Sequence, residues 1–128
     1  MHPLFPEHHP DVYTATFIFA KGDWDAEFHA LDATIAAAAR GLPGYLGEDS
    51  WDNAERGLVC NVYYWDSLEA LQALMQHPAH LEAKQKQARW LQGYQVHVAQ
   101  VLRSYGDGRL AGPVAAPGTP AKHPQRGD

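Results

Sequence analysis

Apolar and polar residues alternate along the chain in a pattern that predicts four strands and two helical regions. Short runs rich in β-branched and aromatic residues lie at 12–19, 45–51, 58–65 and 94–105 and predict strands. Helical spacing of apolar residues predicts one helix over about 25–40 and a second region over 68–90, broken at His77-Pro78. The order βαββαβ predicts a ferredoxin-like α+β fold, an antiparallel four-stranded sheet with helices on one face.

Polar and special residues mark the ends of the predicted helices. Asp23 or Asp25 can accept from the free N–H groups that open the first helix, and Gly41 stops it. Asp66, with Glu69 three residues later, approximates a capping box at the start of the second region. These signals place the ends of the helices independently of the apolar pattern.

A sheet covered on one face leaves its other face open. That face should carry either part of an aromatic set or the residues that alternate with this set along the strands. The aromatic set is Tyr13, Phe17, Phe19, Tyr63 and Trp65. An exposed aromatic sheet face is more often an interface than a solvent surface. We therefore expect a homodimer formed face to face with twofold symmetry.

Length, charge and composition narrow the class of protein. The 128 residues suit one domain at 11–105, between a Pro/His-rich arm at 1–10 and a flexible Gly/Pro/Ala-rich tail at 106–128. Fifteen acidic against ten basic residues argue against nucleic-acid binding. No apolar run is long enough for a membrane span, and the N-terminus lacks a signal-peptide pattern, so we expect a cytoplasmic protein.

Candidate polar groups gather in the third strand and in the helix that follows Pro78. Asn61 shares a strand face with Tyr63 and Trp65, and an amide buried in a sheet needs partners. In the helix after Pro78, four residues share one face at helical spacing: His80, Lys84, Gln87 and Leu91. By default, Lys84, Lys86 and Arg89 form a solvated face of this helix.

Three stretches of the sequence resemble a known family. They are Tyr-Trp-Asp-Ser-Leu-Glu-Ala-Leu at 64–71, His-Pro-Ala-His at 77–80, and Arg89-Trp90 followed by Tyr94. Together with the βαββαβ order, they resemble the antibiotic biosynthesis monooxygenase superfamily of dimeric α+β barrels, over about 12–105. The resemblance implies a homodimer with a cavity between the sheet and the helices of each subunit. The superfamily includes cofactor-free quinone-forming monooxygenases, haem-degrading oxygenases and members with no assigned activity.

The haem-degrading branch of that superfamily uses an Asn, a Trp and a His at set positions. Aligned from Trp65, this chain has Ala15, Leu74 and Lys84 there. All three differ, so the resemblance argues against haem degradation. His80, one helical turn from Lys84, is the alternative axial ligand.

The resemblance therefore implies a cofactor-independent monooxygenase that acts on a small phenol-, anthrone- or quinol-like substrate. Such a site needs a base, which is His80, and a donor to the developing oxyanion, which is Asn61. The residues that would bind the substrate are Tyr63, Trp65 and Tyr94, as walls that stack on its rings, and Trp90, as a second hydrogen-bond donor.

Other interpretations of these residues stay open. His80 can bond the backbone at the helix start, Asn61 can be a satisfied core amide, and Trp65 and Trp90 can be core or interface anchors. His77 and His80 have metal-ligand spacing but lack a third ligand. The alternative function is a non-catalytic dimeric barrel that binds a small ligand or has a structural role.

Overall fold

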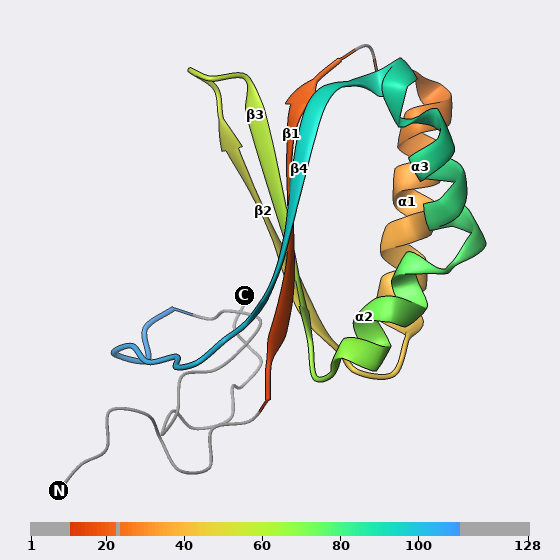
Figure 1. Ribbon diagram of the computed structural model, residues 1–128. Coiled ribbons are helices and arrows are strands. Elements are labelled where there is room, and N and C mark those ends of the chain that lie inside the picture. Colours follow the sequence, from red (N-terminus) through yellow and green to blue (C-terminus); the bar gives the residue numbers. More distant parts are fainter. Residues whose placement is uncertain (1–10, 23, 111–128) are drawn as a thin grey trace, which may run out of the picture.

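The structure, a computed structural model, describes residues 11–22 and 24–110 (Figure 1). Four antiparallel strands form one sheet in the order β2-β3-β1-β4. Figure 1 shows all three helices on one face of this sheet, with α1 and α3 side by side. The elements are β1 (Tyr13–Lys21), α1 (Ala26–Gly41), β2 (Tyr45–Asn53), β3 (Leu58–Trp65), α2 (Leu68–Met75), α3 (Pro78–Trp90) and β4 (Leu91–Gln100). The predicted ferredoxin-like α+β fold is confirmed.

Some earlier expectations fall outside this description. The predicted arm at 1–10 and residues 111–128 of the predicted tail lie outside the described residues. Residues 101–110 follow β4 without forming a further helix or strand. No helix in the described part of the chain is long and apolar enough to cross a membrane.

The predicted N-cap of α1 is confirmed, whereas the one predicted for α2 is wrong. The Asp25 carboxylate accepts the Phe28 N–H at 2.9 Å, as expected for α1. For α2 the predicted cap, Asp66, is wrong: the cap is Ser67, whose hydroxyl oxygen accepts the Ala70 N–H at 3.1 Å. Asp66 lies one residue before the cap, and its own N–H donates to the carbonyl of Gly44 at 2.8 Å.

The last strand differs from its prediction at both ends. It begins at Leu91 directly after α3 and ends at Gln100, whereas the pattern predicted residues 94–105. The cause is its partner, β1. Leu91 pairs with Lys21 beyond a register shift at 20/21, and Gln100 pairs with Tyr13, the first residue of β1. Ladder bonding therefore sets the limits of β4 more than its own alternation does.

Two apolar clusters hold the helices to the sheet. One lies under α2, where Trp65, Leu71 and Leu74 are buried together with Ala39 of α1. The second lies at the other end of the helices. There Phe28 stacks on Trp24 at 4.8 Å between ring centroids and meets Trp90 edge-on at 5.5 Å. The space between these clusters is not filled, and it forms the cavity described below.

Strand alternation settles which residues face the helices. The predicted aromatic set turns inward, and the residues that alternate with it form the open face: Thr14, Thr16, Ile18, Cys60, Val62 and Tyr64. On the neighbouring strand, Trp51 pairs with Cys60 and is 62% exposed. The open face is therefore partly apolar and carries Tyr64 and Trp51, although the predicted aromatic set faces the helices.

Gly44 permits the close approach of the α1–β2 connection to the start of α2. Its φ of +93° is in the left-handed region, and an added Cβ would lie 2.6 Å from the Cβ of Ala70. We expect Gly44→Ala to lower the free energy of unfolding by about 2–4 kcal/mol, measured by urea denaturation. Gly57→Ala is the matched control, because its φ is +65° with open space around the added carbon. Equal losses in the two variants would contradict the steric explanation.

Candidate active site

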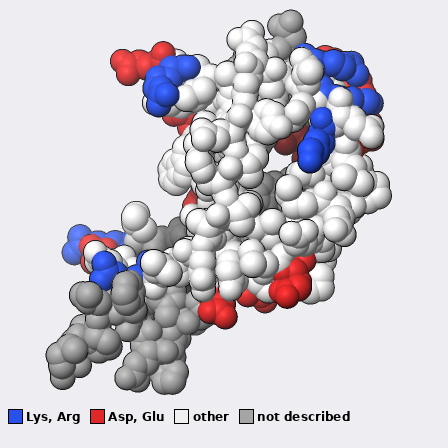
Figure 2. Space-filling model, in the orientation of Figure 1, with Lys and Arg blue, Asp and Glu red and all other residues white. Residues whose placement is uncertain are grey.

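A cavity of about 440 Å³ lies between the sheet and the helices, bounded at its ends by the two apolar clusters. Figure 2 shows the hollow on this face of the molecule, with mostly uncharged atoms around it. The apolar part of the wall comes from both layers and includes Phe17, Phe19, Val96, Leu31, Ile35, Leu71, Leu74 and Met75. A space of this size and character suits a small, flat, largely apolar molecule.

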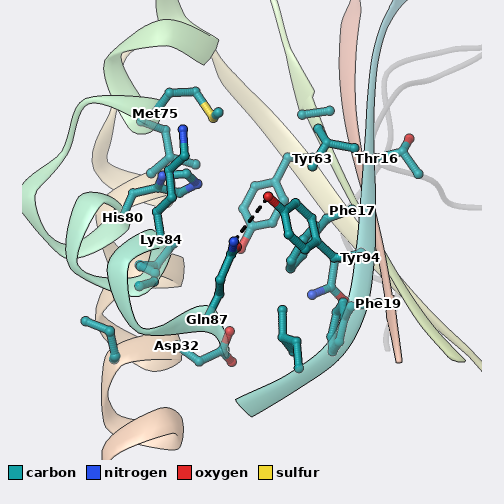
Figure 3. A pocket seen from close by; sticks show the side chains of 18 of the residues that line it. Thr16, Phe17, Phe19, Asp32, Tyr63, Met75, His80, Lys84, Gln87 and Tyr94 are labelled. Atoms are coloured by element: carbon teal, nitrogen blue, oxygen red, sulfur yellow. Dashed lines mark hydrogen bonds between the residues drawn. The ribbon is translucent and has the colours of Figure 1, made fainter. Parts of the chain in front are cut away.

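The six residues predicted for the site all line this one cavity: Asn61, Tyr63, Trp65, His80, Trp90 and Tyr94. They come from three elements. Strand β3 supplies the first three, α3 supplies His80 and Trp90, and β4 supplies Tyr94. Figure 3 shows His80 on the helix side of the cavity, and Tyr63 and Tyr94 on the sheet side. The structure therefore brings the predicted polar groups and ring walls together.

His80 lies in the first turn of α3, where Pro78 starts the helix and the side chain of His77 caps it. The Nδ1 atom of His80 is buried and has no hydrogen-bond partner among the described residues. Burial lowers the pKa of His80, and the positive charge of Lys84 lowers it further. The ring is therefore neutral at pH 7, the form in which an imidazole can accept a proton.

Asn61 is held by a hydrogen bond across the β2–β3 hairpin. The Ser50 hydroxyl donates to the Asn61 side-chain carbonyl at 2.7 Å. This bond occupies the amide oxygen and leaves the NH₂ group without a partner among the described residues. The arrangement gives the cavity a hydrogen-bond donor on the sheet side, opposite the imidazole.

Tyr63 and Trp65 form a stacked pair on the inward face of β3, with ring centroids 6.3 Å apart and planes 13° apart. Trp65 is fully buried, and its indole N–H has no hydrogen-bond partner among the described residues. Burial raises the pKa of Tyr63, so its hydroxyl stays protonated at neutral pH. Both residues thus present an apolar ring together with a donor group.

Gln87 connects the two walls at the edge of the cavity. Its side-chain N–H donates to the Tyr94 hydroxyl at 3.2 Å, and both groups are solvent-exposed (Figure 3). Tyr94 is on the edge strand β4 and is 47% exposed. This side-chain bond between α3 and β4 lies in an exposed part of the cavity wall.

Two charged residues of the wall were not predicted as site residues. Asp32 of α1 and Lys84 of α3 both line the cavity. Burial raises the pKa of the Asp32 carboxyl, and nearby His29 opposes this effect. The shared helical face of His80 and Lys84 was the available signal for Lys84, whereas Asp32 had none beyond its place in an amphipathic helix.

The default interpretation of the basic residues in α3 needs correction. Lys84 lines the cavity, whereas Lys86 and Arg89 face α1. Lys86 pairs with Glu27 and with Glu82, and Arg89 pairs with Glu27 at 3.1 Å. The pairs with Glu27 join the two long helices, so the basic residues divide between two faces of α3, although Lys84 and Arg89 are solvent-exposed as predicted.

The other histidines of the described chain lie away from the cavity wall. Nδ1 of His77 accepts the Ala79 N–H at 3.0 Å, so its ring serves the helix start. His97 is on the outward face of β4, opposite Thr16, and exposed His29 meets Trp24 and Phe28 edge-on. Within residues 11–22 and 24–110, no three His, Cys, Asp or Glu side chains are grouped to hold a metal ion.

Comparison with known proteins identifies the family of this fold and cavity. Residues 12–86 match the antibiotic biosynthesis monooxygenase family. The chain belongs to this family. It is also 33% identical over 96 residues to the uncharacterized protein YqjZ of Bacillus subtilis (strain 168), a match that covers 73% of this chain and 82% of YqjZ. The resemblance seen in the sequence is thereby confirmed.

Solved structures show the same fold at lower sequence identity. A Shewanella oneidensis protein superposes with a TM-score of 0.61 at 12% identity. The match covers 73% of the present chain and 93% of the Shewanella protein. A variant of SnoaB, a cofactor-independent oxygenase from Streptomyces nogalater, superposes with a TM-score of 0.59 at 17% identity, covering 73% and 95%. At these identities, the likeness concerns the fold alone.

Proposed function

We propose that the protein is a cofactor-independent monooxygenase that acts on a small aromatic substrate of the phenol, anthrone or quinol type. The observation that carries the proposal is the position of neutral His80 and the Asn61 amide on opposite walls of one largely apolar cavity. Membership of the antibiotic biosynthesis monooxygenase family and the fold shared with SnoaB support the same reaction class.

The chemistry needs a base, an oxyanion donor and a water-poor space. His80 removes a proton from the substrate, and the resulting carbanion or phenolate passes electrons to molecular oxygen. For an anthrone, the CH₂ carbon becomes a carbonyl, one oxygen atom is retained, and the other leaves as water, so no outside reductant is required. The Asn61 amide donates to the oxygen on which negative charge develops, while Tyr63 and Trp65 hold the rings.

The test is oxygen uptake by metal-free protein with a panel of anthrones and hydroquinones. We expect uptake without any added cofactor, one oxygen molecule consumed for each anthrone converted, and no accumulation of peroxide. Autoxidation of the same compounds without protein sets the background. Binding of these compounds without uptake above that background would contradict the proposal and favour a non-catalytic barrel that binds a small ligand.

We further propose that two copies associate through the open face of the sheet. The support is its apolar content, which includes Ile18, Val62 and exposed Trp51. Sedimentation velocity at micromolar concentration should give the mass of a dimer. A monomer under these conditions would contradict the association.

A further inference from the structure

Lys84 is an unpaired cation in the wall of the cavity. It lies one helical turn after His80, and Figure 3 shows the two side chains together beside Met75. Lys84 makes no ion pair within the described residues, whereas Lys86 makes two. Two residues correspond to about 200° around a helix, so these lysines project to opposite sides of α3.

The surroundings of Lys84 favour an anionic partner from outside the chain. The cavity wall is mainly apolar, and Lys84 is a solvent-exposed member of it, where its positive charge attracts an opposite charge that a ligand brings to the wall. The imidazole of His80 lies in the same region of the wall. An anionic oxygen here would meet a positive charge and lie beside the imidazole.

The opposite part of the cavity has the opposite character. In Figure 3, Asp32 lies away from Lys84, on the far side of Gln87. Its carboxylate repels an anion. The cavity is therefore polarised along its length, and an elongated aromatic anion has one favourable orientation.

We propose that Lys84 is the anion-recognition residue of this cavity, and that the ligand is an aromatic molecule with an anionic oxygen, a carboxylate or an ionised phenol, beside His80. The inference deepens the proposed function, since it specifies the substrate class of the same site. Recognition itself is a binding property and does not require turnover.

Isothermal titration calorimetry with three naphthalene probes tests this inference at pH 7. The probes are 2-naphthoate, which is anionic, 2-naphthylmethanol, which is neutral, and 2-naphthol, which ionises only well above neutral pH. We expect wild-type protein to bind naphthoate about tenfold more tightly than naphthylmethanol. Lys84→Met should remove this difference without weakening naphthylmethanol binding, and Lys84→Arg should retain most of it.

Lys86→Met is the matched control, because Lys86 has the same charge in the same helix but faces α1. It should leave the naphthoate affinity unchanged. If only naphthoate binds more tightly than naphthylmethanol in a Lys84-dependent way, the ligand is a carboxylate. If naphthol also does so, the ligand is an ionised phenol. No naphthoate binding, or equal naphthoate affinity in wild type and Lys84→Met, overturns the inference. Binding with the expected Lys84 dependence but without oxygen uptake would instead contradict only the proposed reaction.

Discussion

Replacing His80 with alanine should reduce cofactor-free oxygen uptake at neutral pH by about 10²–10⁴-fold, the usual contribution of a positioned general base. The expectation rests on the neutral, unpaired ring of His80 in the cavity wall. His97→Ala is the matched control, because that histidine is on the outward face of β4. We expect it to keep the wild-type rate. Uptake that is unchanged in His80→Ala would remove His80 from the mechanism.

The pH dependence of the rate provides a second check on the same residue. Burial and the positive charge of Lys84 lower the pKa of His80 below its ordinary value of 6.5. The neutral form is the base, so the rate should be constant above pH 6.5 and fall as the pH drops through the lowered pKa. The unfolded chain, with an ordinary pKa, binds this proton more readily. The free energy of unfolding should therefore also fall in this range, and less so in His80→Ala.

Replacing Trp65 with alanine should lower the free energy of unfolding by about 3–5 kcal/mol. Trp65 is fully buried in the cluster under α2, and its ring contacts Tyr45 edge-on and Tyr63 face to face. The loss would take a large part of the stability of a domain of this size. Urea denaturation followed by circular dichroism measures it.

Trp51→Ala is the informative comparison for this stability change. Trp51 is the same residue type, but it is 62% exposed on the open face. For Trp65→Ala we expect a loss that is the same at low and high protein concentration. Any loss in Trp51→Ala should grow with protein concentration, because it acts through association of two copies. A Trp65→Ala protein of nearly wild-type stability would mean that the α2 cluster is not the main core.

Local signals in the sequence were sufficient to predict most of the fold. The third strand and the helix from Pro78 to Trp90 have the predicted limits, because a turn rich in Asn and Gly precedes the former and proline begins the latter. The predictions failed where an element depends on a partner. Leu91 is in a strand because Lys21 is opposite, and Asp66, whose N–H bonds the Gly44 carbonyl, lies one residue before the actual cap, Ser67.

In the candidate site, too, local signals predicted some features, whereas others depend on a partner element. Spacing along the helix put His80, Lys84 and Gln87 on one face, and they do line the cavity together. Spacing alone could not tell whether that face meets a cavity or solvent, so Lys84 was assigned to the surface. The bond from Ser50 to Asn61 joins residues eleven positions apart and depends on hairpin register, which is set by the sheet as a whole.

The single cysteine of the chain provides a natural labelling site for detecting what covers the open face. Cys60 lies on the outward side of β3, directly opposite Trp51. A thiol-reactive dye would attach at one defined point without mutagenesis, next to an indole that can quench its emission. The speed of labelling and the brightness of the product then follow association of the sheets in real time, while ligands enter the cavity on the opposite side.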